Sequence, residues 1–358
     1  MTNTRRFHCL VLVPLCLLLS VSATTAQTIT TVMSKLDSPR GLAFGPEGGL
    51  YVTEAGEGIA TGPCVAVAAG SNCYSETGKI TRLYRGEQER VVTGLPSIFN
   101  TVRRDVVGPN DIACQGRGTC FVTIGWGGDP NARANLGASV SSRLGTLLQV
   151  EPSGRWRVDA NVSDYEADNN PQGGPVDSNP YGVFVSANNR YVTDAGGNSL
   201  LRVAPNGQIS LVAVFPRVPA PAPANLTDAV PTEVNVGPDG ALYVSLLTGA
   251  PFTPGAAGIY RVVPGQAPQL YQGGFKTVID FAFGPDGSLY VLEHSIATTF
   301  PPIGTPGRLT KIAPDGTRTE ITRALNRPSS VIVDEDGVIY VSNNGVSVGA
   351  GEVLKIVP

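Results

Sequence analysis

The stretch GLAFGPEGGLYVTE at positions 41–54 decides the fold, because five related stretches follow it along the chain. Each combines an apolar run, a tight turn rich in Gly, Asn or Asp, and a second run built around an aromatic residue and Val. This order of residue types is typical of a β-hairpin, and its recurrence indicates a repeat architecture. The other five are DIACQGRGTCFVTI (111–124), GVFVSANNRYVTD (182–194), EVNVGPDGALYVSL (233–246), DFAFGPDGSLYVLE (280–293) and SVIVDEDGVIYVSN (330–343).

A second hairpin follows most of these stretches, for example from Lys79, Leu200 and Arg308. Four antiparallel strands per unit, here named A to D in chain order, make up a propeller blade. We therefore predict an all-β fold, a six-bladed β-propeller, with two separate β-sandwiches as the alternative. We expect no helix of useful length, because apolar residues alternate or run short and Gly and Pro interrupt them.

The two ends of the repeat region complete each other. The last unit ends with GEVLKIVP at 351–358, which supplies only a third strand. Residues 28–36 (TITTVMSKL) resemble the fourth strands of other units, so we expect this N-terminal strand to pair with 352–357 in the last blade and close the ring. Such pairing removes an exposed strand edge, and two separate sandwiches would not require it.

Residues 1–26 have the pattern of a signal peptide. Two arginines precede an apolar run at 9–21 that is short for a membrane span, and small residues allow cleavage after Ala23 or Ala26. An uncleaved anchor is the alternative. We expect one propeller domain at 27–358 that is secreted or periplasmic, is a monomer, and has no membrane contact after cleavage.

Composition excludes several classes of function. Losing two arginines with the leader changes the net charge from −3 to −5, and no basic stripe suggests nucleic acid. His294 is the one histidine beyond residue 26, which excludes a multi-histidine metal centre. A Ser-His-Asp arrangement would have to use it, and no GxSxG elbow lies between a strand and a helix. A Ca²⁺ site made of carboxylate and amide oxygens stays open.

Four cysteines follow the leader and fall into two local pairs. We favour disulfides between Cys64 and Cys73 and between Cys114 and Cys120, because each closes a short loop. A four-cysteine zinc site is the alternative, but the pairs lack the CxxC spacing that structural zinc usually uses.

The A–B and C–D turns are short, whereas the long connections all join strand B to C or one blade's D to the next blade's A. Long connections therefore share one end of the propeller. Loops on a rigid scaffold tend to carry binding residues, although exposed loops also tolerate insertion. The long connections are residues 55–78, 96–109, 125–142, 161–180, 216–231 and 295–307.

Polar residues at the starts of the A strands and the ends of the B strands are the candidate ligand-binding residues at the channel mouth. We expect this mouth to lie at the loop-bearing end and to bind a polar organic ligand or a cation. The alternative is that these groups hydrogen-bond loop backbone and hold the blades in register. The candidates are Arg40, Glu54, Asn110, Asp111, Tyr181, Asp194, Thr232, Glu233, Asp280, Glu293, His294 and Asn343.

Four stretches give the chain a resemblance to the ScyD/ScyE family of exported, NHL-like propellers. They are LDSPRGLAFGPEGGLYVTEAGEG (36–58), VVTGLPS (91–97), VGPNDIA (107–113) and SNPYGV (178–183). The resemblance covers nearly the whole chain after the leader, and its first blade is the most specific part. It implies export and a six-bladed fold, without a secure reaction.

A more distant resemblance is to the gluconolactonase-like six-bladed hydrolases. That family coordinates a divalent cation in the channel, and Asn110 with Asp111 looks like its Asn-Asp element. The other matching positions depart from the family, because Arg40, Tyr181 and Thr232 stand where its Glu, Asn and Asp ligands would be. An arginine there would repel a metal ion.

We therefore expect a non-catalytic, exported propeller that binds a small polar molecule, a glycan or a protein through its loop-bearing end, without a cofactor. A lactonase or esterase that depends on Ca²⁺ or another divalent cation, held by Asn110 and Asp111, is the alternative.

Overall fold

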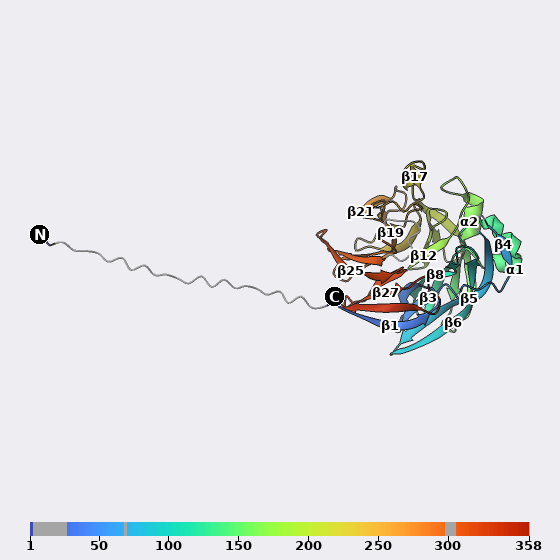
Figure 1. The fold of residues 1–358 in the computed structure, drawn as a ribbon, viewed down its shortest axis with the longest axis horizontal. Coiled ribbons are helices and arrows are strands. Elements are labelled where there is room, and N and C mark those ends of the chain that lie inside the picture. The colour runs from blue at the N-terminus through green and yellow to red at the C-terminus, as the bar shows by residue number, and fades with distance from the viewer. Residues whose placement is uncertain (3–26, 68–69, 298–305, 358) are drawn as a thin grey trace.

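The computed structural model describes residues 1–2, 27–67, 70–297 and 306–357, and it is a six-bladed β-propeller (Figure 1). The expected signal peptide lies outside the described residues. Each blade is an antiparallel sheet of four main strands, so the predicted fold class is confirmed. Blade 1 contains β2 (Pro39–Phe44), β3 (Leu50–Glu54), β5 (Ser71–Tyr84) and β6 (Glu87–Asn100), with β4 (Cys64–Ala66) and β7 (Val106–Val107) attached.

The next four blades repeat this order without interruption. Blade 2 contains β8 (Pro109–Gln115), β9 (Thr119–Ile124), β10 (Thr146–Val150) and β11 (Trp156–Asn161). Blade 3 contains β12 (Pro180–Ser186), β13 (Asn189–Asp194), β14 (Ser199–Val203) and β15 (Ile209–Val214). Blade 4 contains β18 (Pro231–Val236), β19 (Leu242–Leu246), β20 (Ala257–Val262) and β21 (Gln269–Phe275). Blade 5 contains β22 (Val278–Phe283), β23 (Leu289–Glu293), β24 (Pro306–Ile312) and β25 (Arg318–Asn326).

Blade 6 joins the two ends of the chain. It contains β26 (Ser330–Val333), β27 (Ile339–Asn343) and β28 (Gly351–Val357), and its outer strand is β1 (Thr28–Leu36). β1 runs antiparallel to β28, with Thr28 opposite Val357 and Leu36 opposite Gly351. In Figure 1 the blue β1 lies against the red C-terminal strands. The predicted closure of the ring is therefore confirmed, including the bounds of the closing strand.

Hydrophobic residues fill the spaces between blades. For example, Met33 and Leu36 of the closing strand pack with Leu42, Val52 and Val353, and all five are buried. Similar clusters lie between each other pair of neighbouring blades. Two-sided burial explains why the B and C strands read as nearly continuous apolar runs, whereas the outer D strands are more polar.

The loop-bearing end, meaning the end with the B–C and D–A connections, carries short helices that we did not expect. They are η1 (Pro130–Leu136), α1 (Ala138–Ser141) and α2 (Val162–Asn169). Asn161 caps α2 by accepting a hydrogen bond from the backbone N–H of Asp164. Our expectation depended on hydrophobic periodicity, and helices of one or two turns are too short to show it.

Connections from three different places pack together at this end. η1 contacts β4, α1 and α2, and a hairpin of β16 (Val218–Pro219) and β17 (Leu226–Thr227) belongs to the same end of the propeller. In the part of the chain that the structure describes, no helix is both long and apolar enough to span a membrane.

Both expected disulfides are present, Cys64–Cys73 and Cys114–Cys120. Each joins two residues that lie directly opposite each other in a β-ladder. Two disulfides indicate a protein that folds in an oxidising compartment.

Candidate functional site

The six A strands surround the axis of the propeller and bring one equivalent position of every blade to the same depth. Neighbouring A strands contact each other around the ring. This level contains Gly41, Asp111, Gly182, Glu233, Asp280 and Ser330, taken in blade order. Three of the six are acids, so the structure brings Asp111, Glu233 and Asp280 together around the axis, as the sequence suggested.

Backbone amides of the next blade hold two of these acids. The Asp111 carboxylate accepts a hydrogen bond from Val183 N at 2.8 Å, and the Asp280 carboxylate accepts one from Val331 N at 2.8 Å. In the same way Ser330 Oγ accepts from Leu42 N at 3.2 Å. The acids therefore connect blade to blade as well as lining the channel.

Burial raises the pKa of all three carboxyl groups, and the charges of neighbouring acids add to the rise for Glu233 and Asp280. Burial raises the pKa of Asp111 to about 7, although hydrogen bonds from backbone amides and from Glu233 act in the opposite direction. Burial and the negative charges of Asp111 and Asp280 raise the pKa of Glu233 well above its ordinary value, and burial raises that of Asp280. The three groups therefore share protons near neutral pH, because three negative charges cannot be held together in such a narrow space.

A cavity of about 210 Å³ begins at this level and is lined by all six A strands. Besides the three acids, its walls are mostly apolar, with Phe44, Cys114 and Ile332 toward the A–B turns. We expected the acids at the loop-bearing mouth. The structure instead opens their cavity along the half of the channel that leads to the opposite end, which carries the short A–B and C–D turns and is called the plain end. Each A strand starts at the loop-bearing end and rises about 3.3 Å per residue, so a residue two or three positions in already lies well below that mouth.

The first A-strand residues form a second level, closer to the loop-bearing end. In blades 2, 4 and 6 the side chain at this level donates a hydrogen bond to a carbonyl group of the next blade. Asn110 Nδ2 donates to Pro180 O at 2.8 Å, Thr232 Oγ1 to Val278 O at 3.2 Å, and Ser329 Oγ to Pro39 O at 2.7 Å. In blades 1, 3 and 5 the equivalent residues are Arg40, Tyr181 and Ile279, which make no such bond.

The candidates at the ends of the B strands share one architectural role. Each accepts a hydrogen bond from a backbone N–H of the connection that leads into its own blade, as the alternative interpretation proposed. The bonds are Asp37 N to Glu54 at 2.6 Å, Asn179 N to Asp194 at 2.6 Å, Lys276 N to Glu293 at 2.9 Å and Asn326 N to Asn343 at 2.7 Å. All four acceptors are buried, so they stabilise the connections and are poorly placed to meet a ligand.

Sequence reasoning missed a set of hydroxyl groups next to these acceptors. A Thr or Ser occupies the penultimate position of the repeated stretch in five blades, namely Thr53, Thr123, Thr193, Ser245 and Ser342. The Thr193 hydroxyl, for example, accepts from Gly182 N at 2.8 Å and donates to Thr232 O of the next blade at 2.6 Å. The signal was visible as a recurring Thr or Ser after the aromatic-Val pair.

A buried acid on α2 was also missed. Glu166 is 2% exposed, and burial followed by the charges of Asp194 and Asp177 raises its pKa to about 8. Nothing in the chain around Glu166 distinguishes it from the exposed acids of the same helix, because α2 itself was not expected.

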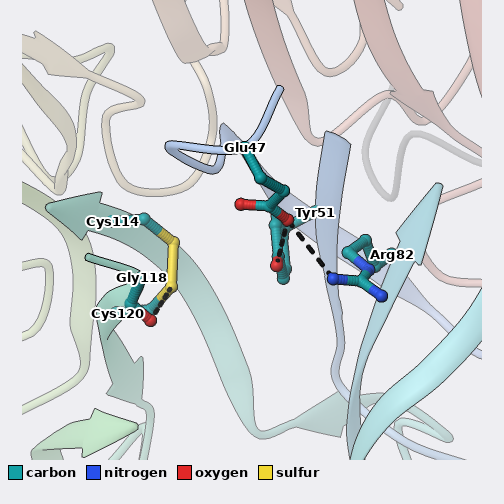
Figure 2. The surroundings of a disulfide bond; sticks show 6 residues. All are labelled: Glu47, Tyr51, Arg82, Cys114, Gly118 and Cys120. Carbon is teal, nitrogen blue, oxygen red and sulfur yellow. Dashed lines mark hydrogen bonds and ion pairs between the residues drawn. A yellow bond between two sulfur atoms is a disulfide. The ribbon is translucent and has the colours of Figure 1, made fainter. Parts of the chain in front are cut away.

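The plain end is stiffened beside the cavity. Figure 2 shows the Cys114–Cys120 disulfide on the first hairpin of blade 2, next to Glu47, Tyr51 and Arg82 of blade 1. The Tyr51 hydroxyl donates to Glu47 at 2.6 Å, and Arg82 lies 3.4 Å from the same carboxylate. Burial raises the pKa of Glu47, but these two partners outweigh it and lower the pKa overall. Cys114 also lines the axial cavity, so the disulfide fixes part of its wall.

Across the described ranges, no three Asp, Glu, His or Cys side chains converge as the ligands of a metal ion would. The Asn110 amide is held by Pro180 O, and Arg40 adds a positive charge at the same level. The residues expected to hold a divalent cation therefore fit one poorly in this arrangement.

Comparisons with known proteins support the fold. No protein-family model matches the chain, and no curated protein matches it in sequence. Among solved structures, it is similar to a glucose dehydrogenase, with 13% identity, a TM-score of 0.54, and coverage of 92% of this chain and 99% of that one. It is also similar to the calcium-binding protein regucalcin of Agrobacterium tumefaciens, with 11% identity, a TM-score of 0.52, and coverage of 91% and 92%.

A streptogramin B lyase is a third similar structure, with 13% identity, a TM-score of 0.51, and coverage of 92% of this chain and 97% of that one. At such identities the likeness shows a shared propeller fold and carries no site or activity across. The protein is therefore a six-bladed β-propeller, similar in fold to these three structures.

Proposed function

We propose that this protein is an exported, ScyD/ScyE-like binding propeller, whose axial cavity takes a small ligand that carries an ammonium group or several hydroxyl groups. One observation carries the proposal, the cavity lined by Asp111, Glu233 and Asp280. Carboxyl groups that share protons accept and donate hydrogen bonds, and they attract cations. The apolar walls would cover the rest of such a ligand.

The size of the cavity narrows the three classes of partner that the sequence suggested. Ligand pockets commonly measure about 300–1,000 Å³, whereas this cavity measures about 210 Å³. That volume suits a molecule of a few heavy atoms. A glycan or a protein would have to bind elsewhere, on the loop-bearing end.

The divalent-cation-dependent lactonase is the weaker proposal. Its support is the fold shared with lactonase-like propellers and the Asn110-Asp111 pair. Against it stand the Asn110 amide bound to Pro180 O and the positive charge of Arg40. Lactone hydrolysis that requires added Ca²⁺ would reverse this preference.

The binding proposal is tested by calorimetric titration of the exported protein with ethanolamine, which carries both an ammonium and a hydroxyl group. We expect saturable binding that weakens at least tenfold in Glu233→Gln and Asp280→Asn, because each removes a carboxyl group that can hold negative charge in the cavity when a cation binds. Asp168→Asn, on the exposed face of α2, is the matched control and should bind like the parent. Absence of saturable heat, or equal affinity in all variants, would reject the acidic cavity as the site.

Export is tested separately by N-terminal sequencing of the protein recovered outside the cytoplasm. A first residue of Thr24 or Gln27 supports the predicted cleavage. An intact Met1 on exported or cell-associated protein would contradict it.

A further inference from the structure

The loop-bearing mouth of the channel holds three polar side chains whose polar atoms are only partly used by hydrogen bonds to the neighbouring connections. Arg40 and Tyr181 are the second residues of β2 and β12. His294 directly follows β23. All three are partly exposed, in contrast to the buried Asn110 and Thr232 of the same level. They are therefore accessible, although Tyr181 also packs against the hydrophobic cluster between blades 5 and 6. Arg40 Nε has no hydrogen-bond partner in the described chain, and the hydrogen bond of His294 uses Nδ1 alone.

Arg40 carries a positive charge that no ion pair in the described chain neutralises. Its Nη2 donates to Val106 O at 3.0 Å, and its Nε is buried without a hydrogen-bond partner. It forms no ion pair with any residue that the structure describes, although most other arginines in blades 1 to 3 do. A shielded guanidinium normally has an anionic partner, so this one points to an anion from outside the chain.

His294 supplies a hydrogen-bond acceptor beside that charge. Its Nδ1 lies 2.9 Å from Pro328 O. A carbonyl oxygen can only accept, so Nδ1 carries the hydrogen and the neutral ring leaves a lone pair on Nε2. Burial, opposed by the Pro328 hydrogen bond, and then the positive charges of Arg40 and Arg327 lower the pKa of His294 to about 4. The ring is therefore neutral at physiological pH and can accept from a hydroxyl group.

Tyr181 lies at the same level as Arg40, one residue before the level of the three acids on its strand. Burial raises its pKa to about 12, Arg40 acts in the opposite direction, and the three channel acids add to the rise. Its hydroxyl therefore keeps its proton.

We propose that Arg40, Tyr181 and His294 form a binding site for the carboxylate of a small hydroxy acid at the loop-bearing mouth. The guanidinium would take the carboxylate, with its two-donor geometry, and His294 Nε2 would accept a hydrogen bond from the neighbouring hydroxyl group. The site differs from the axial cavity in depth and in charge, and it does not depend on the function proposed for that cavity. The acids below would keep the carboxylate at the level of Arg40.

His294 gives the test an unambiguous probe, because it is the one histidine left once residues 1–26 are removed. Long-range ¹H–¹⁵N spectra of the exported protein would show a single imidazole, recorded during titration with glycolate, acetate and methylammonium. We expect saturable shifts of Nε2 with glycolate, at least tenfold weaker binding of acetate, which lacks the hydroxyl group, and no saturable shift with methylammonium. In Arg40→Gln the glycolate affinity should fall at least tenfold.

Arg85→Gln is the matched control, because Arg85 is an exposed arginine on the β5–β6 turn at the opposite end of blade 1. It should leave the glycolate affinity unchanged. Absence of a saturable glycolate shift in the parent protein would overturn the proposal, even if Arg40→Gln failed to fold. Equal glycolate affinity in a folded Arg40→Gln would overturn it as well. Ethanolamine binding is lost with Glu233→Gln rather than Arg40→Gln, so the two proposed sites fail separately.

Discussion

Replacing Leu36 with Ala should destabilise the whole propeller, because this residue is the last member of the strand that closes the ring. Leu36 is 0% exposed and packs between blade 6 and blade 1 with Met33, Leu42, Val52 and Val353. Buried Leu→Ala substitutions cost about 2.7–5.0 kcal/mol, the upper values applying where the site cannot collapse. Neighbours from three strands surround Leu36, so we expect at least about 3 kcal/mol.

Ile29→Ala is the matched control on the same strand. Ile29 is 42% exposed and pairs with Ile356 near the outer end of β1. Its loss should cost less than about 1 kcal/mol, since little packing is removed. Urea unfolding followed by the fluorescence of buried Trp126 measures both variants, and the midpoint should fall while the slope stays constant. Equal costs for Leu36→Ala and Ile29→Ala would refute the packing of β1 into the ring.

Three further predictions concern pH, the blade connections and the disulfides. Burial raises the pKa of Asp111 to about 7, so the folded protein holds a proton that the unfolded chain releases near pH 4. The contribution of this group to the free energy of unfolding is therefore full below about pH 4 and is lost as the pH rises through 7. Urea unfolding between about pH 4.5 and 7 should show a fall of up to about 1.4 kcal/mol per pH unit for each such proton, and Asp111→Asn should make this fall shallower. Asp194→Ala should cost about 3 kcal/mol in the same assay, because it leaves the backbone N–H groups of Asn179, Gly196 and Gly197 without their hydrogen-bond acceptor. The exposed substitution Asp168→Ala should cost almost nothing. Joint Cys114→Ser and Cys120→Ser substitution should cost about 2–3 kcal/mol by loop entropy, and an unchanged melting temperature would show that this bridge does not restrain the unfolded chain.

Much of the fold could be predicted because each hairpin of the propeller is specified by residues that are close together in the sequence. Turn residues such as Gly240 and Gly287 have φ of 76°, which Gly adopts without strain, and they stand between β-branched and aromatic runs. The same local pattern located the closing strand and both disulfides. The short helices at the loop-bearing end were missed, because they depend on caps and on packing against one another rather than on periodicity.

The candidate site could be predicted only in part. The sequence alone identified the polar positions on the A and B strands, since each recurs at a fixed place in the repeat. It could not separate Glu54 and Asp194, which are buried and bound to loop backbone, from Arg40, which is partly exposed and leaves Nε without a hydrogen-bond partner. That separation depends on which amide or carbonyl group the neighbouring segment presents, and this is a property of the assembled ring.

The sequence by itself therefore determined the six blades, the closure of the ring through residues 28–36 and the cysteine pairs. Each of these follows from turn chemistry, strand pattern or short-range spacing. Only the tertiary structure decided that Asp111, Glu233 and Asp280 share one cavity toward the plain end and that Arg40 is left without a counter-charge. These residues come from different blades, and their pKa values and partners arise from burial and through-space charge that no local stretch of sequence encodes.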